Sequence, residues 1–118
     1  LTLQKNLSKF YIKSFTEKSI IIGDNEYTDN IIIYDKIRPW NIKKSELFNL
    51  DSYNTLVTHN PDIIIIGCGN KQILPTQEFI EYFTSNSIGV EIMTTESACK
   101  TFNILISEQR KAIACLIV

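Results

Sequence analysis

Four consecutive isoleucines, Ile63–Ile66, constrain the fold of this 118-residue chain more than any other feature. β-branched side chains favour extended backbone, and successive side chains of a strand point to opposite faces of its sheet. A strand that is apolar on both faces is stable only where both faces are covered. The run therefore predicts an interior strand over 62–66.

The rest of the carboxyl-terminal half alternates helix and strand patterns. The predicted elements, in chain order, are a helix over 77–86 capped by Thr76, a strand over 88–92, a helix that begins after Thr94 or Thr95, and a strand over 111–118. The second helix has its apolar residues at Ala98, Cys99, Phe102, Leu105 and Ile106, the stripe of a helix that lies on a sheet. The last strand is nearly apolar on both faces, so we expect it inside the sheet beside Ile63–Ile66.

The amino-terminal half is typical of antiparallel strands. Residues 10–15, 19–22 and 27–34 carry strand-forming side chains, and a turn signal separates the last two segments. A short helix over 50–58, capped by Asn49, follows. We expect one domain over 1–118, with 1–9 as a poorly ordered arm. The predicted fold class is α/β: three layers, a mixed β-sheet with helices on its faces, and an N-terminal antiparallel β region.

Composition excludes several classes of function. The net charge is −1 and the basic residues are scattered, so there is no electrostatic footprint for nucleic acid. No apolar run approaches the length of a transmembrane helix. Three widely spaced cysteines and one histidine fit neither a disulfide framework nor a structural zinc site, and we expect no metal and no cofactor. Free thiols fit a reducing compartment, which favours the cytoplasm.

The loop after the isoleucine run is the first candidate for chemistry. Ligands of open α/β sheets collect beyond the carboxyl ends of strands, and paired glycines let backbone amides approach an anion. The candidate pocket comprises Gly67, Cys68, Gly69, Asn70, Glu91, Thr94, Thr95, Cys99 and Asn103. Glycines in such a loop more commonly form a tight turn that closes a buried strand, and this is the interpretation we favour. Glu91, which interrupts the 88–92 strand, can equally face solvent. We predict no catalytic residue.

The cysteines allow more than one interpretation. Cys68 could be an exposed thiol between two glycines, and Cys99 lies near a helix N-terminus, where the helix dipole lowers a thiol pKa. For Cys99 and Cys115 the alternative is a buried cysteine that acts as a small hydrophobic residue. His59, the only histidine, precedes the central strand, so we place it at the opposite end of that strand from Cys68 and expect no catalytic dyad.

Three segments carry a family resemblance. They are Pro61–Asn70, with its strand and Gly-x-Gly turn; Gly89–Thr95 followed by Ala98–Leu105 and Glu108–Arg110; and the earlier stretch Tyr27–Trp40. Together they resemble the family of mitochondrial respiratory complex I assembly factor 3 and its uncharacterised bacterial and archaeal relatives, from about Phe10 to Val118. The sequence departs from the family at Cys68, Lys100 and Gln109, where threonine, arginine and glycine are common. The departure at Cys68 puts shared thiol chemistry there in doubt.

The resemblance implies a three-layer α/β/α fold around a mixed sheet and a role that acts through protein partners, with no enzymatic activity attached. We therefore expect a protein-binding or assembly module, without nucleic acid or membrane insertion and with homo-oligomers open. The alternative is a small-molecule or anion-binding protein or enzyme that uses the 67–70 loop, and a third hypothesis is redox sensing through Cys68. The isoleucine- and asparagine-rich composition indicates a bacterial, cytoplasmic protein; a mitochondrial location would apply only to a eukaryotic one.

Overall fold

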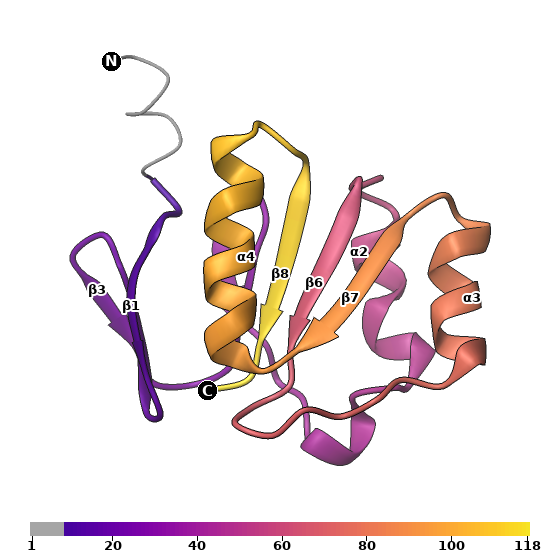
Figure 1. Cartoon of the computed structure of the whole chain (residues 1–118), viewed down its shortest axis with the longest axis horizontal. Coiled ribbons are helices and arrows are strands. Elements are labelled where there is room, and N and C mark those ends of the chain that lie inside the picture. Colours follow the sequence, from indigo (N-terminus) through magenta and orange to yellow (C-terminus); the bar gives the residue numbers. More distant parts are fainter. Residues whose placement is uncertain (1–8) are drawn as a thin grey trace.

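The computed structural model describes residues 9–118 and contains two β-sheets with helices packed around the larger one (Figure 1). The small sheet consists of β1 (Ile12–Thr16), β2 (Ser19–Ile22) and β3 (Asn25–Tyr27). The large sheet consists of β4 (Ile31–Ile33), β5 (Ile37–Pro39), β6 (Ile63–Gly67), β7 (Gly89–Met93) and β8 (Ala112–Leu116). The helices are two 3₁₀ turns (Lys44–Glu46 and Leu50–Tyr53), α2 (Asn54–Val57), α3 (Gln77–Ser85) and α4 (Thr95–Ser107). The predicted 1–9 arm lies almost wholly outside the described residues.

The large sheet is mixed, with strand order β5-β4-β8-β6-β7. β6 pairs in parallel with β8 and β7, whereas β4 pairs antiparallel with β8 and β5. The predicted interior strand is confirmed, because every residue of β6 is buried. The register Ile63↔Ala112 also confirms that the isoleucine run and the last strand lie side by side.

The predicted strand over 27–34 is wrong in one respect, since the chain leaves one sheet for the other in its middle. Tyr27 pairs with Ile20 in the small sheet, and Ile31 pairs with Leu116 in the large one. The polar residues between them form the crossing, where the side chain of Asn30 accepts a hydrogen bond from the Val118 N–H at 2.9 Å. Strand propensity alone could not reveal this change of partner.

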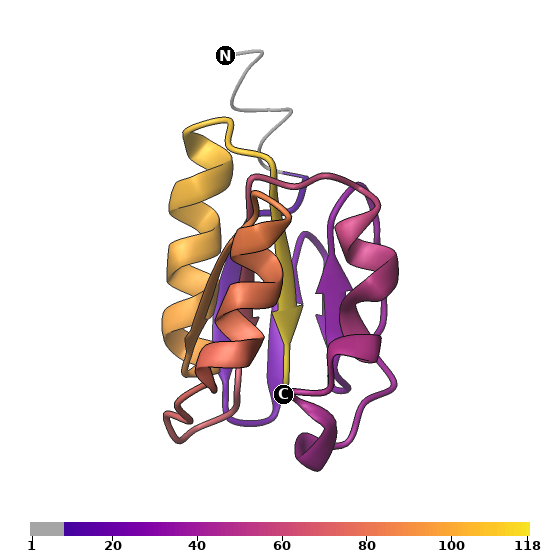
Figure 2. The same cartoon turned by 90° about the vertical axis from the view of Figure 1, so that its right-hand side faces the viewer.

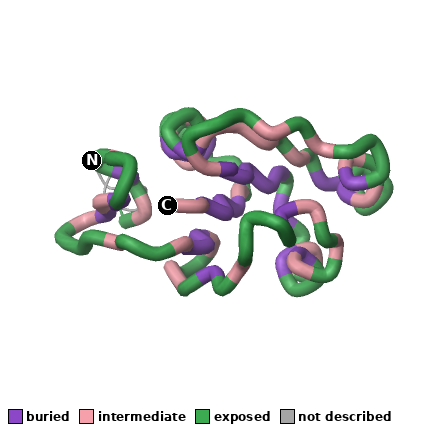
Figure 3. Tube along the Cα trace, turned by 90° about the horizontal axis from the view of Figure 1, so that it is seen from below, coloured by how far each residue is buried: buried purple, intermediate pink, exposed green. Residues whose placement is uncertain are grey.

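The three layers follow from the two faces of the large sheet. One face is covered by α4 and by the small sheet, which contributes Ile12, Ile20 and Ile22 to a shared core. The other face is covered by α2, α3 and the 3₁₀ turns, with Tyr53, Phe79 and Phe83 at its centre. α4 and α2 therefore lie on opposite sides of the sheet (Figure 2), and the buried residues concentrate along the strands between them (Figure 3).

The helix boundaries follow from their caps. The Thr76 hydroxyl accepts from the Phe79 N–H, which confirms the predicted start of α3. Thr94 rather than Thr95 caps α4. The predicted helix over 50–58 is a 3₁₀ turn followed by one α-helical turn, and the Asn49 side chain caps it by accepting from the Asp51 N–H.

α4 ends in a left-handed residue. Gln109 has φ of 59°, the Gln109 N–H donates to the carbonyl of Ile106, and the Arg110 N–H donates to the carbonyl of Leu105. These two bonds form a Schellman motif, whose left-handed position favours glycine. The glycine that the resemblance implies at position 109 would suit this backbone conformation.

Replacing Gln109 with glycine should raise the free energy of unfolding by about 0.5–1 kcal/mol, because glycine adopts positive φ without a Cβ clash. Urea unfolding followed by circular dichroism measures the change. The matched control is Glu108→Gly, one residue earlier at φ of −90°, which should destabilise the protein instead. Equal effects of the two substitutions would contradict this account of the turn.

Candidate functional site

The loop after β6 is held closed against the start of α4. The Thr95 hydroxyl accepts from the Gly69 N–H at 2.9 Å and donates to the Ile117 carbonyl at 2.6 Å. The Thr95 N–H donates in turn to the Gly69 carbonyl. A Cβ on Gly67 would lie 2.9 Å from the Thr95 Cα, so glycine is needed there for close backbone approach. The loop is thus a packed junction between strand and helix.

The other predicted pocket residues lie apart from this junction. Glu91 is exposed on the edge strand β7, and Asn70 is exposed beyond the loop. Asn103 faces β1, where its amide donates to the Ile12 carbonyl at 2.9 Å and its carbonyl accepts from the Ile12 N–H at 2.8 Å. Cys99 is buried on the same helix.

Three of the nine residues, Gly67, Gly69 and Thr95, meet at a packed junction, and Thr94 caps α4. Cys99 and Asn103 line a separate cavity between α4 and β1. The sheet–helix contact that brings the loop to α4 also fills the space between them, so these residues meet by packing and a shared ligand pocket stays a prediction.

The three thiols are buried. The Cys68 thiol donates to the Lys71 carbonyl at 3.2 Å. Burial raises the pKa of Cys99 to about 12, with a smaller contribution from the negative charge of Glu96. Cys99 thus follows the buried-cysteine alternative and not the lowered pKa of a helix N-terminus, since removal from water outweighs the helix dipole. Burial also raises the pKa of Cys115 and of Tyr53.

We expect no thiol to react with iodoacetamide at pH 8 in the folded protein, and all three to react in urea, because reaction needs an accessible thiolate. Mass spectrometry of the alkylated chain measures this. Selective labelling of Cys68 in the folded protein would revive the redox hypothesis.

Stability should fall as pH rises from about 9 towards 12. The ordinary pKa of cysteine is 9.0 and that of Cys99 in the folded chain is about 12, so the unfolded state loses its protons first in this window. Between these two pKa values the unfolded chain binds fewer protons than the folded chain, so a rise in pH favours unfolding and lowers the free energy of unfolding. Urea midpoints measured from pH 7 to 11 test the sign. Cys99→Ala should flatten part of this decline, and an undiminished slope would contradict the assignment to Cys99.

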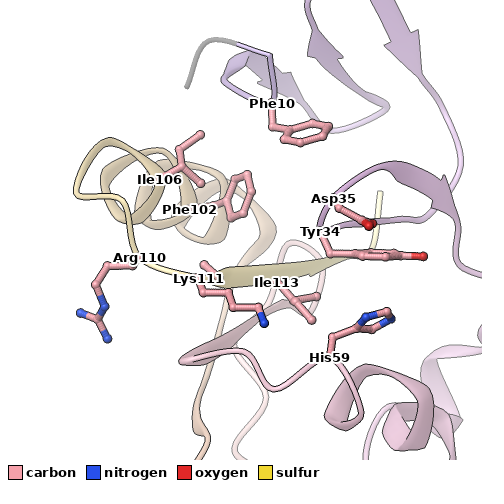
Figure 4. Close-up of a pocket in the computed structure, with 10 residues that line it drawn as sticks. Phe10, Tyr34, Asp35, His59, Phe102, Ile106, Arg110, Lys111 and Ile113 are labelled. Carbon is pink, nitrogen blue, oxygen red and sulfur yellow. The ribbon is translucent and has the colours of Figure 1, made fainter. Parts of the chain in front are cut away.

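A cleft of about 340 Å³ opens at the opposite end of the sheet, where β8 begins (Figure 4). It is lined by Phe10, Tyr34, Asp35, His59, Phe102, Ile106, Arg110, Lys111, Ala112 and Ile113. The cleft exists because β4 turns away early: its last pair with β8 is Ile33↔Ala114, so Ala112 and Ile113 have no partner in β4.

The cleft has an apolar floor and a polar rim. Phe102 is buried beneath it on the α4 side of the sheet, Ile113 is buried on the opposite face, and Phe10 and Ile106 are partly buried at its walls. The volume is within the range of small-ligand sites. Such a floor suits an apolar group from a ligand or a partner.

Charged and aromatic side chains form the rim. The ring of Tyr34 lies 4.8 Å from the ring of His59, centroid to centroid. Arg110 Nε lies 3.9 Å from Asp62 Oδ2, the one ion pair within residues 9–118. The Lys111 ammonium and the Asp35 carboxylate are exposed and lack such partners in this range. No three metal-ligating side chains gather anywhere in residues 9–118.

Sequence reasoning missed this cleft. It placed His59 correctly at the far end of the central strand but gave that end no role. The lining residues come from five segments that the fold brings together, and no motif links them. The only sign of the cleft in the sequence is that the strand-forming residues before β5 stop at Tyr34.

Comparison with known proteins identifies a family and several relatives of the chain. A family model described as a protein of unknown function (DUF498/DUF598) matches residues 12–117. The 13 kDa major membrane protein of Francisella tularensis is 33% identical, with 100% of this chain and 99% of that protein covered. An NADH dehydrogenase [ubiquinone] 1 alpha subcomplex assembly factor 3 from Xenopus tropicalis is 28% identical over 98% of this chain, and the match spans 65% of its length.

A solved structure supports the fold. The crystal structure of an outer membrane protein from Bartonella henselae aligns with a TM-score of 0.81 at 18% identity, covering 93% of this chain and 95% of that one. The resemblance to complex I assembly factors is confirmed by the aligned relatives. The chain therefore belongs to the DUF498/DUF598 family, a family of unknown function that is related to complex I assembly factors.

Proposed function

We propose that this chain is a protein-binding assembly factor, one that holds a partner subunit while a larger complex forms. The observation that carries the proposal is the relationship to NADH dehydrogenase assembly factors over 98% of this chain. The match leaves about a third of the Xenopus factor uncovered, so the shared region is the α/β fold itself. A role common to both proteins would then reside in surfaces of this fold.

The proposal also accounts for the relative that is named a membrane protein. No helix within residues 9–118 has both the length and the apolar character that crossing a bilayer requires. The Francisella relative is nevertheless named a major membrane protein. We propose that this chain works in the cytoplasm and can attach peripherally to a membrane-bound partner. Washing isolated membranes with alkaline carbonate should then release it.

Affinity isolation tests partner binding. The tagged full chain, expressed at its natural level in its own cells and isolated at low salt, should bring down one protein in near-stoichiometric amount. Intensity-based mass spectrometry measures the ratio, and a tagged chain with unfolding substitutions in the core supplies the background. Recovery of the chain only as a free monomer or as a homo-oligomer would count against a partner subunit.

A further inference from the structure

We propose that the cleft at the start of β8 binds an apolar group that carries a carboxylate. This inference goes beyond assembly-factor function and does not depend on it. Two sources present this chemistry: a small organic acid, and the carboxyl-terminal residue of a protein chain when that residue is apolar.

The apolar half of the ligand is set by the floor. Phe102, on the α4 side of the sheet, is 1% exposed, so its contacts with the core fix its position and this side of the cleft is already formed. Phe10 and Ile106 supply the walls on the α4 side of the sheet. A ring or branched chain placed there would bury apolar surface without displacing protein side chains.

The charged side chains at the rim determine where the carboxylate of the ligand would bind. Two cations, Arg110 and Lys111, line the cleft against one carboxylate, Asp35. Arg110 lies near Asp62 and its side chain points away from the cleft, whereas that of Lys111 extends beneath β8 towards His59 (Figure 4). Within residues 9–118 the Lys111 ammonium has no ion-pair partner, so it is the group that would attract an anion.

Asp35 orients the ligand. It lies on the wall formed by the turn between β4 and β5, across from the α4 residues (Figure 4). A ligand carboxylate near Asp35 would be repelled, and one near Lys111 would be attracted. The two charges thus have opposite expected effects on the same ligand, which makes the proposal testable with single substitutions.

The test is a titration of the ¹⁵N-labelled full chain, followed by amide chemical shifts, with two probes of one skeleton and opposite charge. 3-Phenylpropionate should bind with a dissociation constant on the order of 1 mM, as expected for a ligand of this size. Its shifts should centre on Phe102, Ile106 and Ala112. 3-Phenylpropylamine should bind more weakly.

Single substitutions distinguish binding at the cleft from a non-specific effect of the protein's overall charge. Lys111→Gln should weaken 3-phenylpropionate binding roughly threefold to fivefold, the range of one exposed charge pair. Asp35→Asn should strengthen it. Lys18→Gln, the same change in the turn between β1 and β2 and outside the cleft, should leave it unchanged.

Two further probes identify the source. The peptide acetyl-Gly-Gly-Phe with a free carboxylate is compared with its carboxamide. Tighter binding of the peptide acid than of 3-phenylpropionate would indicate a protein chain end, and weaker binding would indicate a small acid. Amine binding as tight as acid binding, shifts centred elsewhere, or equal effects of Lys111→Gln and Lys18→Gln would overturn the proposal.

Discussion

Replacing Thr95 with valine is expected to lower the free energy of unfolding by about 2–4 kcal/mol. The substitution keeps the shape of the side chain and removes a hydroxyl that is fully buried. That hydroxyl is bonded to the Gly69 N–H and the Ile117 carbonyl. Each buried group left without its partner costs about 1–3 kcal/mol. The two losses act together because one oxygen joins β6, α4 and the end of β8.

Urea unfolding measured by circular dichroism tests this expectation, provided that the denaturant slope stays unchanged. Thr101→Val is the matched control, since it removes the same atoms from the same helix. The Thr101 hydroxyl is partly buried and donates only to the sulfur of Met93 at 3.4 Å, so its loss should cost less than about 1 kcal/mol. Equal losses at the two positions would show that the closed loop contributes no special stability.

Replacing Phe83 with alanine is expected to cost about 3–5 kcal/mol, the range for deleting a buried ring. Phe83 is 0% exposed and lies at the centre of the α3 face of the sheet. Its ring contacts those of Phe79 and Tyr53 edge to face, with centroids 5.0 and 5.6 Å away. These neighbours are themselves fixed by packing, so the cavity cannot collapse.

Phe48→Ala is the control for this prediction. Phe48 is only partly buried and its ring contacts the same cluster at its edge, 5.1 Å from Phe79. Its removal opens a surface dent rather than an enclosed cavity, so the loss should be clearly smaller. Thermal unfolding of both variants measures the difference. A Phe48 variant as unstable as the Phe83 variant would contradict the proposed layering.

The sequence predicted the large sheet well because its signals were local. Ile63–Ile66 and the apolar segment 111–118 could be stable only inside a covered sheet, and both are there. The helix caps at Thr76 and Asn49 could also be predicted from the sequence, because a cap depends only on residues within one helical turn. The split of 27–34 between two sheets could not be predicted, since it depends on a pairing partner more than eighty residues away in the chain.

The candidate site was less predictable. Gly67, Gly69 and Thr95 were brought together as expected, but the pattern that predicts a ligand loop also predicts a packed turn. Only the distance between the Gly67 backbone and Thr95 distinguishes the two. The cleft near His59 depends on where β4 stops pairing with β8, which is a property of register and not of composition.

Deletion of the gene in its own organism tests the proposed assembly role most directly. Membrane and soluble complexes from deleted and wild-type cells are separated on native gels, and each subunit is quantified by mass spectrometry. The account predicts that one complex loses its assembled form while its subunits accumulate unassembled, and that a plasmid copy of the chain restores it. Unchanged amounts of every complex would contradict the account.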